Sequence, residues 1–192
     1  MKIILGSQSA NRREVLEKAG YQFEIMVPGI DEKAIRHADP YEIPVLLAKA
    51  KATALLPKIK EPALLITADQ VIVWNGGVYE KAEDEVEARR FLSLFNGSPY
   101  PAAHVNGVGV TNTMTGRSQF VREVSNAYFS TIPKSIVDEF FASGAWKGKA
   151  GGYDIRHPIL APFIRLEGTM DSALGLPMNV VEQSIKELEI VK

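Results

Sequence analysis

The chain has 192 residues, a formal net charge of −1 and a hydrophobic fraction of 46%, which is enough for the core of one large domain or two small lobes. A net charge this close to zero creates no global field that would recruit nucleic acid or an anionic membrane, so any anion binding must be local. The absence of cysteine excludes a disulfide, a thiolate zinc site and a cysteine nucleophile, and it favours the cytoplasm. No stretch approaches the roughly 18 apolar residues of a membrane-spanning helix.

Strands and helices alternate along the chain. The apolar periodicity and the capping residues predict helices at 10–19, 40–56, 83–95, 133–143 and 178–189. The patterns of alternating or continuous apolar residues predict strands at 2–5, 21–27, 63–74, 105–110, 118–124, 126–131 and 159–166, with a hairpin turn at 75–77. Because several strands are linked by hairpins, we expect a mixed α/β sheet rather than a purely parallel one.

The first strand leads directly into an unusual first turn of helix. The strand ends at Gly6, and Ser9 is suited to be the N-cap of the following helix. Arg12 and Arg13 then lie in the first turn, where the positive end of the helix dipole disfavours each of them by about 0.3–1 kcal/mol. A phosphate bound at the helix N-terminus would reverse that sign. The sequence leaves two interpretations open, a phosphate site or two solvated surface arginines.

Three carboxylates are candidates for chemistry. Asp69 lies inside an apolar run, so it must be paired, bound to a metal or placed at a strand end that faces a cleft. It is therefore either a metal ligand or general base, or a salt-bridge partner or turn residue. Asp31 and Glu32 lie in a loop without an apolar pattern, where an acidic pair is usually solvated.

Two lysines and a glycine-rich loop are further candidates for the functional site. Lys51 lies about 80° from the centre of the apolar stripe on the second helix, so it is expected to border the buried face, although most such lysines only extend to solvent. Lys81 follows the hairpin and is either a phosphate-facing ammonium or a surface lysine. The loop 148–153 allows close approach of backbone to a ligand but does not match a P-loop. Arginines, lysines and carboxylates together suit phosphate and hard cations such as Mg²⁺ or Mn²⁺.

In their order along the chain, these motifs resemble those of the Maf proteins, nucleoside triphosphate pyrophosphatases once described through septum formation. Residues 6–16 are similar to that family's Ser-x-Ser-x-x-Arg-Arg-x-x-Leu signature. Residues 47–52 are similar to its Leu-Ala-x-x-Lys-Ala motif, which selects Lys51. Residues 68–70 correspond to its Ala-Asp-Thr segment, and Glu32 aligns best with its acidic metal-binding residue.

The C-terminal half matches the same family with departures. Residues 148–153 and 175–177 match its C-terminal signatures, and Lys81 matches the lysine of its Gly-Lys-Pro segment without the flanking glycine and proline. Residues 96–101 lack the arginine of its Ser-Gly-Arg-x-His motif, and Arg156 follows Ile155 where the group acting on dTTP and UTP has glutamine. Base recognition is therefore expected to differ from either common subgroup.

The resemblance implies an α/β fold with a mixed, elongated β-sheet and flanking helices in two lobes, as in inosine triphosphate pyrophosphatases. Residues 1–192 would form one Maf-like domain with a central cleft, in a cytoplasmic protein with a tendency to form homodimers. It would hydrolyse a canonical or modified nucleoside triphosphate to the monophosphate and pyrophosphate, in a reaction that depends on Mg²⁺ or Mn²⁺. No nucleic acid or membrane partner is expected.

The resemblance also implies a role for each candidate residue. The triphosphate would be held by Ser7, Ser9, Arg12 and Arg13. Lys51 and Lys81 would neutralise developing charge, while Glu32 and Asp69 would hold the metal ion, with Asp69 also able to activate water. The base would contact Gly151, Gly152 and Arg156.

Two other functions are compatible with these residues. A nucleotide-binding regulator of cell division on the same fold would bind nucleotide without releasing pyrophosphate. A general phosphate-ester hydrolase would release orthophosphate directly.

Overall fold

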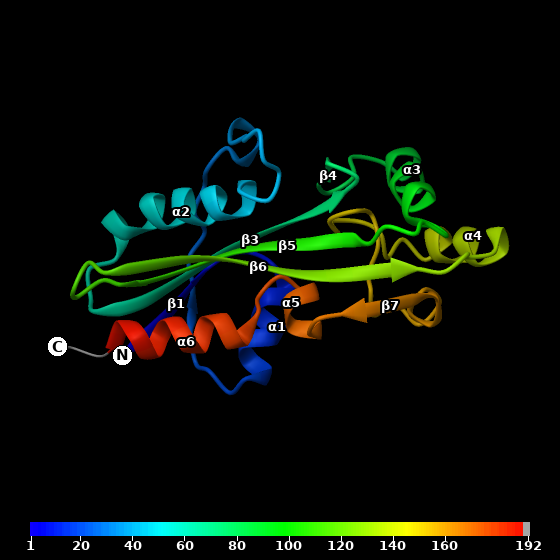
Figure 1. The fold of residues 1–192 in the computed structure, drawn as a ribbon. Coiled ribbons are helices and arrows are strands. Elements are labelled where there is room, and N and C mark those ends of the chain that lie inside the picture. Colours follow the sequence, from blue (N-terminus) through cyan, green and yellow to red (C-terminus); the bar gives the residue numbers. More distant parts are fainter. Residues whose placement is uncertain (190–192) are drawn as a thin grey trace. The chain divides into compact units, whose positions relative to one another are not determined.

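The structure, a computed structural model that describes residues 1–189, is a mixed α/β fold (Figure 1). Its strands are β1 (Lys2–Gly6), β2 (Glu24–Ile25), β3 (Ala63–Trp74), β4 (Gly77–Tyr79), β5 (Ala102–Asn112), β6 (Ser118–Phe129) and β7 (Ile164–Glu167). Its helices are α1 (Ala10–Lys18), α2 (Ile43–Leu55), α3 (Glu85–Phe95), α4 (Lys134–Ala142), α5 (Met170–Ala173) and α6 (Met178–Glu189), with short 3₁₀ helices η1 (Glu32–Ala34), η2 (Leu56–Lys58) and η3 (Ala161–Phe163). Within residues 1–189, none of the helices combines the length and the apolar character needed to cross a bilayer.

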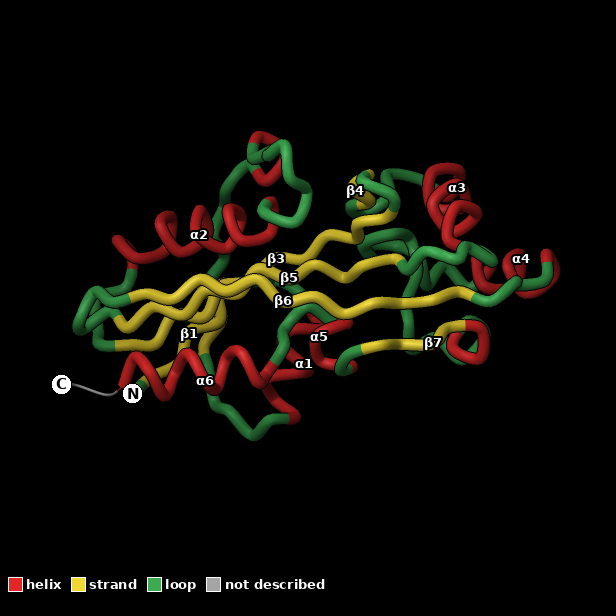
Figure 2. The backbone as a smooth tube through the Cα atoms, in the orientation of Figure 1, coloured by secondary structure: helices red, strands yellow, loops and turns green. Residues whose placement is uncertain are grey.

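The strands form one seven-stranded sheet in the order β2-β1-β3-β5-β6-β7, with β4 paired to β3 off this path (Figure 2). β1 pairs in parallel with both β2 and β3, whereas β3 and β4 pair antiparallel, as do β6 and β7. The mixed α/β class predicted from the sequence is confirmed.

Three strand predictions were wrong in extent. The strands expected at 118–124 and 126–131 are one continuous strand, β6, because the buried Ser125 continues the extended backbone instead of starting a turn. The strand expected at 21–27 is reduced to Glu24–Ile25, because it pairs with β1 at only two positions and both of its residues are exposed.

Prolines explain two further differences. The strand expected at 159–166 begins only at Ile164, because Pro162 lies in the first turn of η3 and its ring favours that turn over an extended ladder. The helix expected from residue 40 begins at Ile43, where Pro44 occupies the first turn, a position at which its missing N–H carries no cost.

Contacts between Cα atoms divide the chain into two units. Unit 1 comprises residues 1–70, 105–123 and those from 170 onward, and unit 2 comprises residues 71–104 and 124–169. β3, β5 and β6 each contribute residues to both units.

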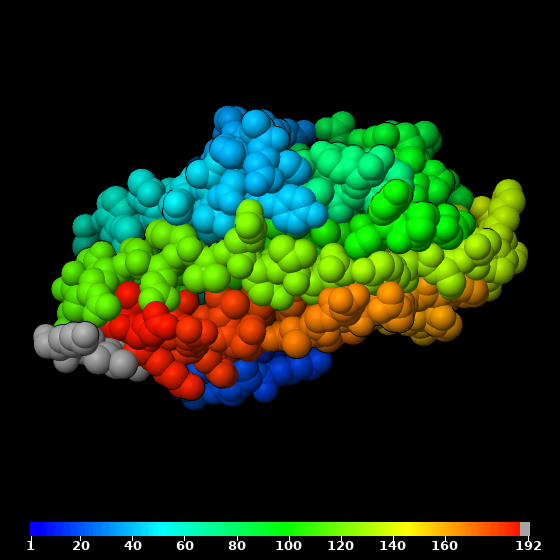
Figure 3. Space-filling model, in the orientation of Figure 1, coloured from blue at the N-terminus to red at the C-terminus, as the bar shows by residue number. Residues whose placement is uncertain are grey.

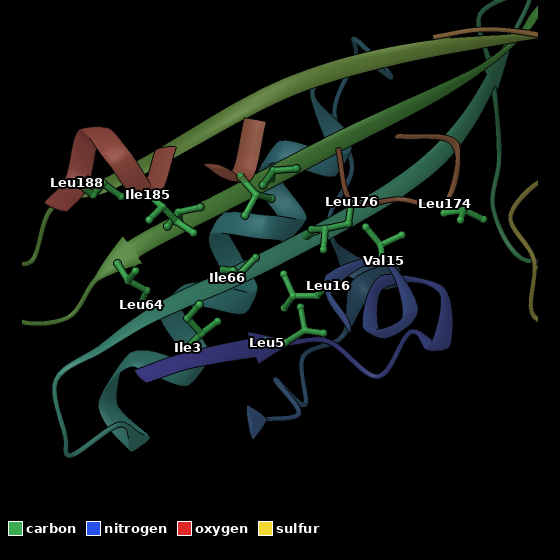
Figure 4. Close-up of a cluster of buried hydrophobic side chains, with 14 residues drawn as sticks. Ile3, Leu5, Val15, Leu16, Leu64, Ile66, Leu174, Leu176, Ile185 and Leu188 are labelled. Carbon is green, nitrogen blue, oxygen red and sulfur yellow. The ribbon is translucent and has the colours of Figure 1, made fainter. Parts of the chain in front are cut away.

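The core of unit 1 follows from the alternation of side chains along β1 and β3. Side chains on one face pack against α1 and α6 (Figure 4). That cluster consists of Ile3, Leu5, Val15, Leu16, Leu64, Ile66, Ala68, Val108, Val110, Leu174, Leu176, Val181, Ile185 and Leu188. The intervening side chains Ile4, Ala63 and Leu65 pack against Ala52 and Leu55 of α2 on the opposite face. The sheet of unit 1 is therefore covered on both faces.

The C-terminal helix α6 also contacts the beginning of β6. In the space-filling view α6 (red) lies beside this part of the strand (green) (Figure 3). Gln119 of β6 donates a hydrogen bond to Glu187 of α6, and the side chain of Asn112 donates to the carbonyl of Leu188 at 3.2 Å. These contacts hold α6 at the end of the unit 1 sheet.

The core of unit 2 is largely aromatic. Tyr79 makes edge-to-face contacts with Phe91 and Phe95, and Tyr153 contacts Phe95 and Phe129 in the same manner. Burial raises the pKa of the Tyr153 hydroxyl, which hydrogen-bonds His104 Nε2 at 2.6 Å. The phenol is therefore neutral and serves as a polar anchor inside this core.

One glycine lets α2 approach the sheet of unit 1 unusually closely. A Cβ atom added at Gly107 of β5 would lie 2.1 Å from the carbonyl carbon of Pro44 and 2.3 Å from the nitrogen of Val45. Both are backbone atoms, so no side-chain rotation could relieve the collision. The first turn of α2 thus depends on glycine at position 107.

We expect Gly107→Ala to lower the free energy of unfolding by about 3 kcal/mol, because the helix must move away from the sheet. Urea unfolding followed by circular dichroism measures this loss. Gly148→Ala is the control: Gly148 has a φ of +69° and open space around its Cβ position, so only the backbone strain of about 1 kcal/mol applies there. Equal losses in the two variants would contradict the close approach of α2.

Candidate active site

The candidate site lies where β1 ends. Gly6, the last residue of β1, pairs with Thr67, whereas β3 continues to Trp74. Asp69 therefore lies beyond the end of β1, at the level where the chain turns into α1. The carboxyl ends of parallel strands are where α/β sheets generally bind ligands.

The turn after β1 is built around two serines and Arg12. Ser9 is the N-cap of α1, and its hydroxyl accepts from the backbone N–H of Arg12 at 3.4 Å, which confirms the predicted cap. The Ser7 hydroxyl accepts from the Ser9 N–H at 3.2 Å and from Nη1 of Arg12 at 3.0 Å. Nε of Arg12 donates to the carbonyl of Gly175 at 3.0 Å.

The two arginines of this turn have different environments. Arg12 is 8% exposed, whereas Arg13 is exposed to solvent. Loss of solvent lowers the pKa of Arg12, while the nearby charges of Asp69 and Glu32 act to raise it. Within residues 1–189, the hydrogen-bond acceptors of Arg12 are two neutral oxygens. A buried guanidinium with five N–H groups and no direct carboxylate partner is poised to bind an anion.

A second buried cation, Lys51, contacts Asp69 directly. Nζ of Lys51 contacts Oδ1 of Asp69 at 2.6 Å, Oε1 of Glu32 at 2.8 Å and the carbonyl of Ala68 at 3.4 Å. The side chain of Lys51 is only 4% exposed and that of Asp69 only 10%, whereas Glu32 is about half exposed at 49%. Lys51 thus borders the buried face of α2 as the sequence predicted, and Asp69 is paired.

Different elements supply the two carboxylates. Asp69 belongs to the residues of β3 whose side chains face α2, which brings it to Lys51. Glu32 is the first residue of η1, and Asp31 caps that short helix by accepting from the N–H of Lys33 at 3.1 Å. Of the two adjacent acidic residues, Glu32 therefore enters the site, while Asp31 shapes the loop.

This pair of carboxylates offers the hard oxygen donors that a divalent cation such as Mg²⁺ prefers. Since both contact the same nitrogen, Oδ1 of Asp69 and Oε1 of Glu32 lie at most about 5.4 Å apart. No group of three or more histidine, aspartate or glutamate side chains suited to a metal occurs in the described part of the chain. Mg²⁺ is commonly held by one or two carboxylates together with substrate phosphates, so two suffice.

Lys81 and the glycine-rich loop lie together in unit 2. The backbone of Lys81, whose side chain is exposed, forms an antiparallel bridge with Ala150. The N–H of Gly151 donates to the carbonyls of Tyr79 and Glu80 at 3.1 and 3.0 Å. Gly151 and Gly152 both have positive φ, and a Cβ atom at Gly152 would lie 2.9 Å from that of Ala88. The two glycines are therefore required by the packing of this loop.

Arg156 belongs to an ionic group that closes the same loop. Asp154 contacts Lys149 at 2.9 Å and Arg156 at 3.7 Å. Burial acts to raise the pKa of Asp154, but hydrogen bonds from Lys149 and from the Arg156 backbone, with the charges of both, lower it overall. Arg156 thus has a structural partner besides any role with a ligand.

A polar cluster near Arg12 was not predicted from the sequence. Gln70, Asn106 and Glu123 lie on neighbouring strands and hydrogen-bond one another or Ser172 of α5. Asn106 and Ser172 have 0% exposure. The sequence signal for this cluster is Asn106, a polar residue in the middle of a mostly apolar strand. A polar side chain that is buried in such a strand needs a hydrogen-bond partner.

Comparison with known proteins identifies the family. The family model described as Maf-like protein matches residues 2–188. A 7-methyl-GTP pyrophosphatase of Dictyostelium discoideum is 37% identical over 97% of this chain and 96% of its own length. The dTTP/UTP pyrophosphatases of Vibrio cholerae and Pelotomaculum thermopropionicum are 31% and 32% identical, over 95% and 97% of this chain and 95% and 96% of their own lengths.

Among solved structures, a nucleoside-triphosphatase (dITP/XTP pyrophosphatase) of Mycobacterium abscessus aligns with 100% of this chain and 99% of its own, at 14% identity and a TM-score of 0.42. The family model covers nearly the whole sequence, and the three pyrophosphatases match it over almost their full lengths. The chain therefore belongs to the Maf-like protein family.

Proposed function

We propose that the residues around the end of β1 hydrolyse a nucleoside triphosphate to the monophosphate and pyrophosphate. The chain is a nucleotide pyrophosphatase, a hydrolase that acts on a phosphoric anhydride bond, in line with the names of its relatives. The observation that carries the assignment to this site is the buried Arg12 in the first turn of α1, whose partners are the neutral oxygens of Ser7 and Gly175.

The triphosphate binds to Arg12 and to the first turn of α1. The positive end of the helix dipole attracts negative charge. Arg12 adds a planar set of donors, which the Ser7 hydroxyl and the Gly175 carbonyl hold in one orientation. Ser9 caps the helix, and the exposed Arg13 adds positive charge at the entrance.

Lys51, Asp69 and Glu32 carry the chemistry. Glu32 and Asp69 would hold Mg²⁺ or Mn²⁺, which would supply positive charge to stabilise the charge on the phosphates. Water adds to the α-phosphoryl group, its proton passes to the carboxylate of Asp69, and the bond to the β-phosphate oxygen breaks to release pyrophosphate. Lys51, already in contact with Asp69, neutralises charge that develops in the transition state.

Several parts of this proposal rest on the family resemblance. The contribution of Lys81 to catalysis and the contacts of Gly151, Gly152 and Arg156 with the base stay predictions. So do the homodimer, the cytoplasmic location, and the organisation as one Maf-like domain with two lobes and a central cleft. The relatives act on 7-methyl-GTP or on dTTP and UTP, which makes these nucleotides the first substrates to test. No finding favours the non-hydrolysing regulator.

We expect purified protein with Mg²⁺ or Mn²⁺ to convert a nucleoside triphosphate to its monophosphate and pyrophosphate. Chromatography of the nucleotides and separate assays for pyrophosphate and orthophosphate test this on a panel that includes 7-methyl-GTP, dTTP, UTP and the other canonical triphosphates. Chelation of the metal should abolish turnover. Direct release of orthophosphate, or nucleotide binding by folded protein without turnover, would contradict the proposal.

We expect Asp69→Asn to lower kcat by about a hundredfold or more at saturating metal, because the amide cannot accept the proton of the attacking water. The control is Asp138→Asn in unit 2, which removes a more exposed carboxylate that pairs with Arg89 at 2.8 Å. The control should retain wild-type turnover. Wild-type kcat in folded Asp69→Asn would remove Asp69 from the mechanism.

Glu32→Gln should raise the Mg²⁺ concentration needed for half-maximal activity by about tenfold or more, because an amide is a poorer ligand than a carboxylate. Electron paramagnetic resonance of Mn²⁺ measures the affinity without turnover. Asp31→Asn is the neighbouring control, since asparagine keeps the cap of η1. If both variants bind Mn²⁺ as the wild type does, Glu32 is not a ligand.

A further inference from the structure

A polar cluster replaces apolar residues on one face of the unit 1 sheet. On β3 and β5 the residues of this face are apolar at Ala68 and Val108, but the next positions on the same face are Gln70 and Asn106. Glu123 of β6 completes the cluster with Ser172 of α5. We refer to these four residues, Gln70, Asn106, Glu123 and Ser172, as the Glu123 network.

The network is closely hydrogen-bonded. Oε2 of Glu123 accepts from the Ser172 hydroxyl and from Nδ2 of Asn106, the latter at 3.0 Å. Nδ2 of Asn106 also lies 3.0 Å from the carbonyl of Ser172, and Oδ1 of Asn106 accepts from Nε2 of Gln70 at 3.1 Å. Nε2 of Gln70 in turn reaches the carbonyls of Ser172 and Ala173 at 3.1 and 3.2 Å.

These bonds fix the end of α5. Ser172 and Ala173 are the last two residues of the four-residue helix α5. The amides of Gln70 and Asn106 satisfy the carbonyls of Ser172 and Ala173, and Glu123 holds the Ser172 side chain. The network therefore ties the end of α5 to three strands of the sheet.

The fixed segment leads directly to Arg12. Gly175 follows α5 after one residue, and its N–H donates to the carbonyl of Ser172 at 2.9 Å. The carbonyl of Gly175 then accepts from Nε of Arg12 at 3.0 Å. Gly175 has a φ of +93°, and a Cβ atom there would lie 3.3 Å from Nε of Arg12 and 3.7 Å from Cβ of Gln70. Glycine thus lets the backbone fit between Arg12 and the network.

We propose that the Glu123 network positions Arg12 for the phosphates of the substrate, acting through the backbone of Ser172 to Gly175. This inference rests on the proposed role of Arg12 in binding the triphosphate. Holding the guanidinium by a backbone carbonyl, instead of a carboxylate, leaves its charge available to the substrate. The carboxylate of Glu123 holds the Ser172 side chain and so fixes the segment that contacts Arg12, but it does not itself pair with Arg12. These four residues are positioning residues and do not contact the reacting atoms.

The first test is the affinity for pyrophosphate, which contacts the phosphate site but undergoes no turnover. Isothermal titration calorimetry with Ser172→Ala should show binding weakened by about tenfold, because the carbonyl that orients Arg12 is no longer held in place. With nucleoside triphosphate, KM should rise by a similar factor while kcat changes less. Glu123→Gln, which keeps an oxygen acceptor for Ser172 and Asn106, should restore most of the affinity lost in Glu123→Ala.

A double-mutant cycle with Arg12→Lys separates positioning from general loss of structure, because lysine cannot make the paired contacts of a guanidinium. If the network acts through Arg12, Ser172→Ala weakens pyrophosphate binding in the wild-type background but hardly at all in the Arg12→Lys background. Equal loss in both backgrounds, or no loss in either, would overturn the inference. Glu187→Ala, which removes an exposed carboxylate hydrogen-bonded to Gln119 and Gln183, is the control and should bind pyrophosphate normally.

The same experiment distinguishes the two proposals. If Arg12→Lys binds pyrophosphate as tightly as the wild type does, the assignment of Arg12 as a phosphate ligand is wrong, and the positioning role falls with it. If Arg12→Lys weakens binding but Ser172→Ala does so independently, only the positioning role is wrong.

Discussion

The contact of Lys51 with Asp69 and Glu32 is the interaction on which the candidate site depends. An ammonium only 4% exposed and a carboxylate only 10% exposed would each be costly without the other. Their pairing joins α2 to β3, and the third partner, Glu32, joins the η1 loop to both. One buried cation therefore brings three segments of unit 1 together and holds the two carboxylates on the same nitrogen.

The second buried cation is held in the opposite way. Lys51 is surrounded by carboxylates, whereas Arg12 hydrogen-bonds to the Ser7 hydroxyl and the Gly175 carbonyl. The carboxylates neutralise the charge of Lys51, whereas the neutral oxygens leave the positive charge of Arg12 in place. In the proposed mechanism, the first arrangement supplies the carboxylates and the second supplies the charged group for the phosphates.

The fold positions both cations through the unequal lengths of β1 and β3. Because β1 stops opposite Thr67, the first turn of α1 lies next to the part of β3 that carries Asp69 and Gln70. Asp69 faces α2 and Lys51, while Gln70, the next residue, joins the network beside Gly175. Neighbouring residues of a strand point to opposite faces of the sheet. β3 therefore presents Asp69 to Lys51 on one face and Gln70 to the segment that holds Arg12 on the other.

The sequence by itself determined the mixed α/β class, the boundaries of β3 and α6, the Ser9 cap and the place of Lys51 at the buried face of α2, because each depends on local periodicity or capping. Tertiary structure decided the rest. Only the packing shows that Glu32 rather than Asp31 reaches Lys51, that Arg12 is buried while Arg13 is exposed, and that Glu123 and Ser172 meet. These outcomes depend on contacts between residues far apart in the chain, for which local patterns carry no signal.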